Sequence, residues 1–226
     1  MCKENDAKTA PLCIRGAIFD MDGTLLDSMW IWEHYASQYI RMRGLIPAND
    51  LDARLDTATL AEAADLLRRE YNLPESTAET VADIERTVKL LYERVLPKPG
   101  VMEMLERFRR AGVRMAVATL TEREDAEHVL SRLGILPYLA GIFTCSEAGA
   151  PKTCPNVFFA ALAALGTRRE ETPVFEDAAY ALRTAQAAGF PTIAVCDASQ
   201  DIADVLPTAV LIIRDYRGIA WESYLA

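Results

Sequence analysis

The chain has 226 residues, 51% of them hydrophobic, which is enough apolar material for one large domain or for one domain with an insert. Its formal net charge is −9, and its Lys and Arg residues are scattered among acidic ones, so nucleic acid and anionic membranes are unfavourable partners. The five cysteines show no CxxC spacing, which argues against a zinc site or a disulfide framework. No apolar run resembles a signal peptide or approaches the ~20 residues of a membrane span. We therefore expect a cytoplasmic protein, whose oligomeric state the sequence leaves open.

Short apolar runs rich in β-forming residues recur along the chain, as is typical of buried parallel strands. They lie at 12–19, 113–118, 141–144, 173–175, 192–195 and 209–213. Helical patterns fall between them at 101–111, 122–133, 156–165 and 178–188, and a glycine follows each one, as at many left-handed helix ends. Strands that alternate with amphipathic helices predict a three-layer α/β/α, Rossmann-like core with a parallel sheet.

The strand rhythm breaks once, directly after the first strand. Helical stretches at 29–43, 59–71 and 77–96 follow one another with turn signals between them, and Pro97, Pro99 and Gly100 then precede the return to the α/β pattern. This organisation predicts a helical cap domain of residues 29–97 inserted into a core domain of residues 1–28 and 98–226.

Polar residues stand where several of the predicted strands end. Ligands of an open parallel sheet bind beyond the carboxyl ends of its strands, so these side chains should converge on one edge of the sheet. They are Asp20 and Asp22 after the first strand, Thr119 after the second, Lys152 in the loop after the third, and Glu176 and Asp177 after the fourth.

Such a gathering of carboxylates repels itself unless a cation neutralises it. Oxygen ligands without His or Cys suit Mg²⁺, which also keeps positions for water and a phosphate oxygen. A carboxylate beside Mg²⁺ and Lys152 can attack phosphorus, and the second carboxylate of the Asp20/Asp22 pair can act as general acid and base. Gly23 permits a tight turn after this pair.

Residues 19–28, with the core Asp20-Met21-Asp22-Gly23-Thr24, resemble the first motif of the haloacid dehalogenase superfamily in its phosphatase branch. Thr119 resembles the threonine of the second motif, and Lys152 the lysine of the third. Glu176-Asp177, followed by residues 185–189, resembles the fourth. The order and spacing of the motifs fit, and the resemblance extends over essentially the whole chain, including a helical cap.

The resemblance implies a role for each matched residue. Asp20 would be the nucleophile and a metal ligand, and Asp22 the acid/base, with its backbone carbonyl on the metal. Thr119 would hold the phosphate, and Lys152 would bridge nucleophile and phosphate. Asp177 and Glu176 would complete the Mg²⁺ site. Contacts with the substrate would come from the motif residues and the cap: Gly23, Thr24, Leu120, Thr121, Trp30 and Thr57.

The predicted function is hydrolysis of a small phosphorylated metabolite, a sugar phosphate or a nucleotide, through an aspartyl-phosphate on Asp20. One alternative is a phosphosugar mutase of the β-phosphoglucomutase type, which needs cationic groups for a second phosphate. Alignment with that type places Ala58 at its loop arginine, Glu122-Arg123 at its Lys-Asn pair and Trp32 at its histidine, which favours hydrolysis. The other alternative is a phosphate-binding regulator without catalysis.

Overall fold

The structure is a computed structural model that describes residues 12–55 and 58–225. The chain divides into two compact units, an α/β unit of Met1–Asp27 and Leu96–Ala226 and a helical unit of Ser28–Val95. Each unit is described below by itself.

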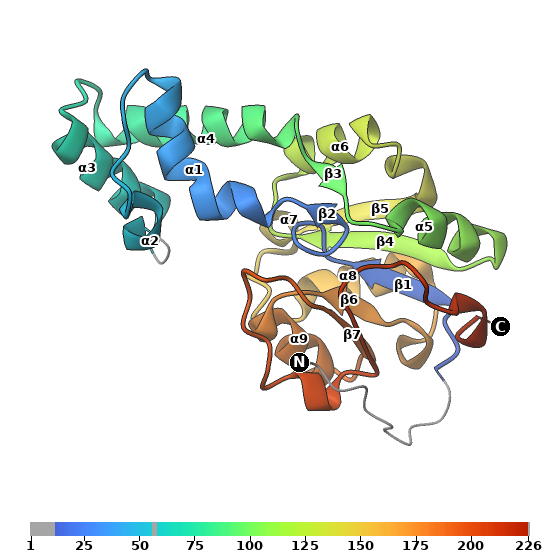
Figure 1. The fold of residues 1–226 in the computed structure, drawn as a ribbon. Coiled ribbons are helices and arrows are strands. Elements are labelled where there is room, and N and C mark those ends of the chain that lie inside the picture. The colour runs from blue at the N-terminus through green and yellow to red at the C-terminus, as the bar shows by residue number, and fades with distance from the viewer. Residues whose placement is uncertain (1–11, 56–57, 226) are drawn as a thin grey trace. The chain divides into compact units, whose positions relative to one another are not determined.

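The α/β unit is built on a parallel sheet of six strands in the order β5-β4-β1-β6-β7-β8 (Figure 1). The predicted parallel α/β core is thereby confirmed. The strands are β1 (Gly16–Phe19), β4 (Arg114–Thr119), β5 (Leu139–Thr144), β6 (Val174–Glu176), β7 (Thr192–Val195) and β8 (Leu211–Ile213). The first strand is shorter than predicted, because the backbone bends at Arg15 and Ile14 forms an isolated bridge with Leu225.

Side chains alternate between the two faces of the sheet, as the strand repeat requires. Ile18 and Val174 belong to a buried cluster with helices α8 (Asn156–Leu165) and α9 (Ala179–Ala187). Phe19 and Phe175, one residue further along their strands, pack against each other with tilted rings whose centroids are 4.4 Å apart. Phe108 of α5 (Val101–Arg110) packs beside them, together with Trp221 of the C-terminal segment. The remaining helices of this unit are α6 (Arg123–Arg132) and the short α7 (Cys145–Ala148), which the sequence analysis did not predict.

The helical unit contains α1 (Met29–Met42), α2 (Leu51–Leu55), α3 (Leu60–Tyr71) and α4 (Thr77–Tyr92). Capping boxes define two of the helix starts, because Thr59 and Ser76 accept from the amides of Glu62 and Glu79. Helix α2 was not predicted, and α4 ends at Tyr92 instead of reaching residue 96.

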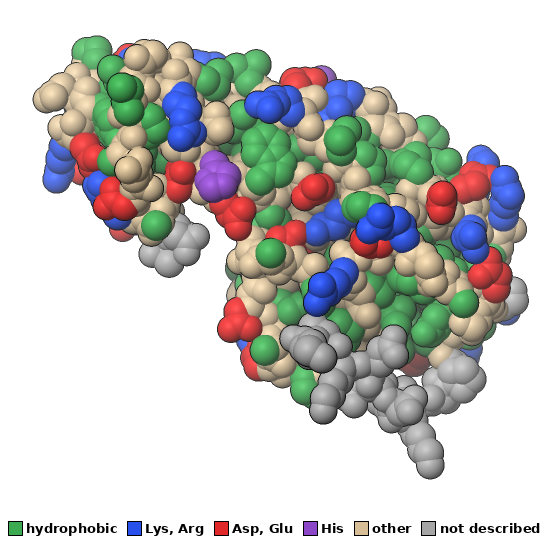
Figure 2. Space-filling view, in the orientation of Figure 1, with side chains coloured by type: hydrophobic (Ala, Val, Ile, Leu, Met, Phe, Trp, Pro, Cys, Tyr) green, Lys and Arg blue, Asp and Glu red, His purple; other side chains and the backbone are tan. Residues whose placement is uncertain are grey.

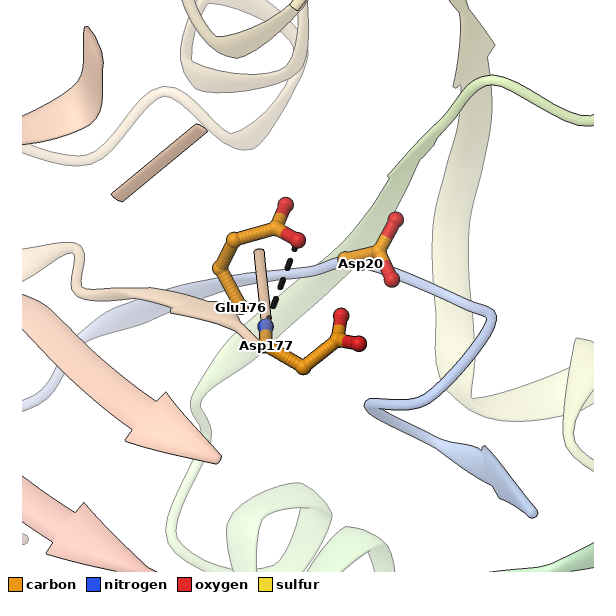
Figure 3. A group of neighbouring side chains, drawn as sticks. All are labelled: Asp20, Glu176 and Asp177. Carbon is orange, nitrogen blue, oxygen red and sulfur yellow. Dashed lines mark hydrogen bonds between the residues drawn. The ribbon is translucent and has the colours of Figure 1, made fainter. Parts of the chain in front are cut away.

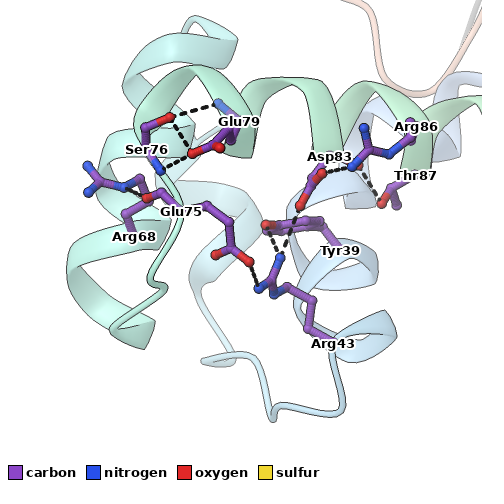
Figure 4. A network of polar contacts seen from close by, with 9 residues as sticks. All are labelled: Tyr39, Arg43, Arg68, Glu75, Ser76, Glu79, Asp83, Arg86 and Thr87. Atoms are coloured by element: carbon purple, nitrogen blue, oxygen red, sulfur yellow. Dashed lines mark hydrogen bonds and ion pairs between the residues drawn. The ribbon is translucent and has the colours of Figure 1, made fainter.

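A polar network ties α1 to the following helices within the helical unit (Figure 4). The Arg43 guanidinium donates to the Tyr39 hydroxyl at 3.0 Å and to Asp83 at 3.2 Å, and it also pairs with Glu75. The Arg43 side chain therefore joins the end of α1 to the connection before α4 and to the middle of α4.

A two-stranded antiparallel ribbon lies in the α/β unit where the chain leaves for the insert and returns from it. Its strands are β2 (Leu26–Asp27) and β3 (Leu96–Pro97). Just after β3, the buried Lys98 donates to Leu25 O through its amide at 2.8 Å and pairs with Asp197 through Nζ at 2.5 Å. The return of the chain is therefore held on the α/β unit by backbone and side-chain bonds.

Basic and acidic side chains are interspersed on the face that Figure 2 shows. Among the residues that the structure describes, no helix combines the length and the apolar character that crossing a membrane requires.

Candidate active site

Three buried carboxylates lie together at the carboxyl edge of the sheet (Figure 3). Asp20 follows β1, Glu176 ends β6, and Asp177 comes next. Because Phe19 of β1 is in register with Phe175 of β6, the residues that follow them emerge side by side. One carboxylate oxygen from each of the three residues lies within 4.8 Å of the others. The Asp177 amide donates to Glu176 Oε1 at 3.2 Å, as does the amide of Ala178.

Lys152 reaches this cluster from the loop between α7 and α8. Its side chain is only 2% exposed, and Nζ donates to Glu176 Oε2 at 2.8 Å and to Asp20 Oδ1 in a short contact. Burial by itself lowers the pKa of an ammonium, but Asp20 and Glu176 outweigh it and raise the pKa of Lys152. The lysine is therefore a permanent cation between two carboxylates.

One ammonium does not neutralise this many carboxylates. Burial, with Glu176 as the next cause, raises the pKa of Asp20 to about 8, although Lys152 opposes the shift. Burial, followed by the charges of Asp20 and Glu176, raises the pKa of Asp177 to about 9. The buried site therefore favours the protonated forms of Asp20 and Asp177 unless another cation is present.

The donor set fits a hard divalent cation. All three converging groups are carboxylates, and they offer oxygen ligands without nitrogen or sulfur. Burial first, and the neighbouring carboxylates second, raise the pKa values of Asp20 and Asp177, and a cation bound here would favour their ionised forms.

Asp22 lies two residues after Asp20, on a tight turn. Gly23 has φ of +79°, and its amide donates to Leu26 O at 3.0 Å. The amides of Leu25 and Leu26 both donate to Met21 O, at 3.0 and 2.9 Å. This turn sets the backbone beneath Asp22, whose carboxylate accepts a hydrogen bond from the Thr121 hydroxyl at 2.7 Å.

Thr24 is completely buried, and its hydroxyl donates to Asp177 Oδ1 at 3.2 Å. Its backbone carbonyl accepts from the Tyr216 hydroxyl at 3.2 Å. The side chain thus contacts Asp177, and the substrate contact expected of Thr24 stays a prediction.

The segment after β4 brings three predicted residues to the same edge. Thr119 is buried at the end of the strand, and its Oγ1 accepts from the Thr121 amide at 3.0 Å. That bond leaves the Thr119 hydroxyl hydrogen able to donate to a phosphate oxygen. Leu120 is 51% exposed.

The remaining predicted substrate contacts belong to the insert. Trp30 lies on α1, where the Arg94 guanidinium stands 5.8 Å from the centre of its ring. Thr57 lies outside the described residues.

The sequence analysis missed Tyr216. Its ring stacks on Phe175 with centroids 6.3 Å apart, and its amide donates to Pro99 O at 2.9 Å. Burial, together with the charges of Asp20 and Asp177, raises the pKa of its phenol far above the usual range. No sequence motif marks Tyr216. The aromatic residues Tyr216, Trp221 and Tyr224 suggest packing in the core, and their spacing does not point to a functional site.

The fold and the site together place the chain in the class of parallel α/β proteins that have an acidic site at the carboxyl edge of the sheet. Within this class the chain belongs to the haloacid dehalogenase-like hydrolases, because the family's sequence pattern matches residues 14–209. The family resemblance of the sequence motifs is thereby confirmed.

Named relatives agree with this assignment, and a solved structure shares the fold. The chain is 29% identical over 188 residues to fructose-1-phosphate phosphatase YqaB of Escherichia coli, covering 80% of this chain and 95% of that protein. It is 25% identical over 181 residues to a phosphorylated carbohydrates phosphatase of Thermotoga maritima, covering 80% and 84%. The structure of a putative β-phosphoglucomutase from Thermotoga maritima shares the fold, with a TM-score of 0.81, 24% identity and coverage of 90% and 95%.

Proposed function

We propose that the protein is a Mg²⁺-dependent phosphomonoesterase that hydrolyses a small phosphorylated sugar or sugar alcohol through an aspartyl-phosphate on Asp20. The observation that carries the proposal is the joint placement of Asp20, Glu176, Asp177 and Lys152 at the carboxyl edge of the sheet. It sets a carboxylate beside an ammonium and beside oxygen ligands for a divalent cation, and phosphoryl transfer to a carboxylate requires such cations around the nucleophile.

Phosphoryl transfer to the enzyme is the first step. An oxygen of Asp20 attacks phosphorus while the bond from phosphorus to the ester oxygen breaks. Asp22 gives its proton to the leaving alkoxide, which departs as an alcohol. The Thr119 hydroxyl and the Lys152 ammonium bind oxygens of the phosphoryl group during its transfer.

Hydrolysis of the acyl phosphate completes the cycle. Water attacks phosphorus, Asp22 accepts the proton that this water loses, and the bond from phosphorus to Asp20 breaks. Phosphate leaves, and Asp20 and Asp22 return to their starting states. The same carboxyl thus acts as acid in one step and as base in the next.

Asp20, Glu176 and Asp177 would hold the Mg²⁺, together with the backbone carbonyl of Asp22. The cation supplies positive charge that keeps Asp20 ionised and offsets the negative charge of the phosphate. Thr24 would orient Asp177 for this role through its hydrogen bond to Oδ1.

Two considerations support a sugar or sugar alcohol as the bearer of the phosphate. The relatives include proteins named for fructose 1-phosphate, for phosphorylated carbohydrates and for hexitol phosphates. The chain is also acidic, with a net charge of −9, which disfavours ligands of high negative charge such as bisphosphates.

The mutase alternative receives little support from the residues after the second motif. Glu122 accepts from the Ser146 hydroxyl, and the Arg123 guanidinium is engaged by Glu147 and by Ile142 O. An acid stands where a mutase needs a cation, and the neighbouring cation is already paired.

A phosphate-release screen in Mg²⁺ tests the proposal. The panel contains fructose 1-phosphate, hexitol phosphates, glucose phosphates and 2-phosphoglycolate, and it compares the wild type with Asp20→Asn. Asp204→Asn, which changes an exposed Asp paired with Arg183, is the matched control. We expect release by the wild type and the control, and loss of about 10⁴-fold or more in Asp20→Asn.

Equal release by Asp20→Asn would refute the proposed nucleophile, and no release from any ester would refute the phosphatase. β-Glucose 1-phosphate with a trace of the bisphosphate tests the mutase, because only a mutase converts it to the 6-phosphate. Binding of phosphate without turnover on the whole panel would favour the regulator.

A further inference from the structure

In the loop after β4, the side chain of Thr121 makes a contact with the candidate active site. Leu120 beside it is exposed, whereas the Thr121 hydroxyl donates to Asp22 Oδ2 at 2.7 Å. The two residues are 99 positions apart, and they meet because β4 and β1 are paired in the sheet.

The contact does not compete with a helix cap. Helix α6 starts at Arg123 and its N-cap residue is Glu122, so Thr121 lies one residue before the capping position. The Thr121 hydroxyl is therefore available for the bond to Asp22.

Backbone bonds fix both partners of this contact. The Thr121 amide donates to Thr119 Oγ1 at 3.0 Å, which ties the loop to the end of β4. On the other side, the Gly23 turn and the bridge between Asp22 and Leu26 hold the backbone of the acid. With both backbones held, the hydroxyl and the carboxylate meet between two fixed segments.

We infer that Thr121 is a positioning residue, which orients the Asp22 carboxyl for proton transfer to the leaving oxygen and from the attacking water. The inference rests on the proposed function, because it takes Asp22 as the acid and base of that reaction. It replaces the substrate contact expected of Thr121 with an action through Asp22.

Kinetics of Thr121→Val and Thr121→Ser test the inference. Valine keeps the shape without the hydroxyl, and serine restores the donor. A carboxyl misplaced by about 1 Å can lower a rate by roughly 100-fold, so we expect Thr121→Val to lose about 10- to 100-fold in kcat with KM nearly unchanged. Thr121→Ser should keep most of the rate. Thr184→Val, whose hydroxyl donates to Tyr180 O on α9, controls for the exchange itself.

Coupling to Asp22 distinguishes positioning from binding. In an Asp22→Asn background, the further change Thr121→Val should cost little, since the group that it orients has already been removed. An increase in KM at unchanged kcat in Thr121→Val would instead identify a substrate contact and overturn the inference. A full additional loss in the double variant would overturn it as well.

A crystal structure of Thr121→Val provides a test that is independent of turnover. We expect the Asp22 carboxylate to leave its wild-type orientation in Thr121→Val and to regain it in Thr121→Ser. An unchanged carboxylate in Thr121→Val overturns the inference even if the phosphatase is confirmed. If the wild type hydrolyses no ester while the carboxylate turns in this way, the proposed function fails and the orienting contact stands.

Discussion

Removing the ammonium from the carboxylate cluster provides a strong physical test of the site. In Lys152→Met the buried Nζ disappears, and with it the hydrogen bonds to Asp20 and to Glu176. Methionine fills a similar volume but carries no charge. Two buried carboxyls then lose their common partner.

The expected cost follows from the burial of this ion pair. Breaking a buried ion pair by removing one partner costs about 3–5 kcal/mol, because an uncompensated charge stays behind. For a chain of this size, each kcal/mol shifts the melting temperature by roughly 2–4 °C, which gives a decrease of about 6–20 °C. Differential scanning calorimetry in EDTA at pH 8 measures this decrease in melting temperature.

The dependence on pH has a definite sign. An aspartate whose pKa is raised by folding contributes stability that is fully present below its ordinary pKa of 3.8 and is lost as the pH rises through the folded value, about 8 for Asp20. Removal of Lys152 takes away a group that lowers this pKa and thus steepens the loss. The deficit of Lys152→Met should therefore be small near pH 5 and largest at pH 8.

Magnesium should stabilise Lys152→Met more than it stabilises the wild type, because the cation replaces the missing positive charge. Lys98→Met is a matched control, since Lys98 is 7% exposed and pairs with Asp197 outside the cluster. Magnesium should not rescue that variant. A melting temperature of Lys152→Met equal to that of the wild type in EDTA at pH 8 would refute the electrostatic reasoning.

Three further predictions concern the metal and the backbone. Thr24→Val removes a hydrogen bond to the Asp177 carboxylate, worth about 1.5–3 kcal/mol, and should raise the half-saturating Mg²⁺ concentration by roughly 10- to 100-fold, whereas Thr24→Ser keeps the wild-type value. Calorimetric titration should show that the affinity for Mg²⁺ rises between pH 5 and pH 8 and that binding releases protons. The reason is that Asp20 and Asp177 have pKa values of about 8 and about 9 without the cation. An affinity that does not change with pH would contradict this prediction. Gly100→Ala places a Cβ 2.7 Å from the Arg217 backbone nitrogen at a φ of +84°, and it should lower the free energy of unfolding by about 1–3 kcal/mol in urea titration without altering kcat.

Much of the fold could be predicted because its signals are local. Apolar runs that end at polar residues mark the strands, and glycine follows the helices that end in the left-handed region, as at Gly134 and Gly166. Local signals failed where contacts with distant residues decide the structure. The run from residue 12 continues as an apolar pattern, but Ile14 bonds with the C-terminal segment and does not extend the strand. Helix α2 is too short to show a helical period.

The candidate site divides in the same way. Asp20, Glu176 and Asp177 follow strand ends in the sequence, and parallel strands present their ends at a common edge. The order of the strands is a property of the packed sheet, and it makes β6 the neighbour of β1 and so brings Glu176 beside Asp20.

The sequence by itself determined the kinds of groups at the site and the edge at which they gather, because both depend on residue type and on the local repeat of strand and helix. Only the tertiary structure decided which hydroxyl donates a hydrogen bond to which carboxylate. Thr24 donates to Asp177, and Thr121 donates to Asp22. A hydrogen bond requires two side chains to meet within about 3 Å, and that distance is set by strand pairing and burial, which no local pattern records.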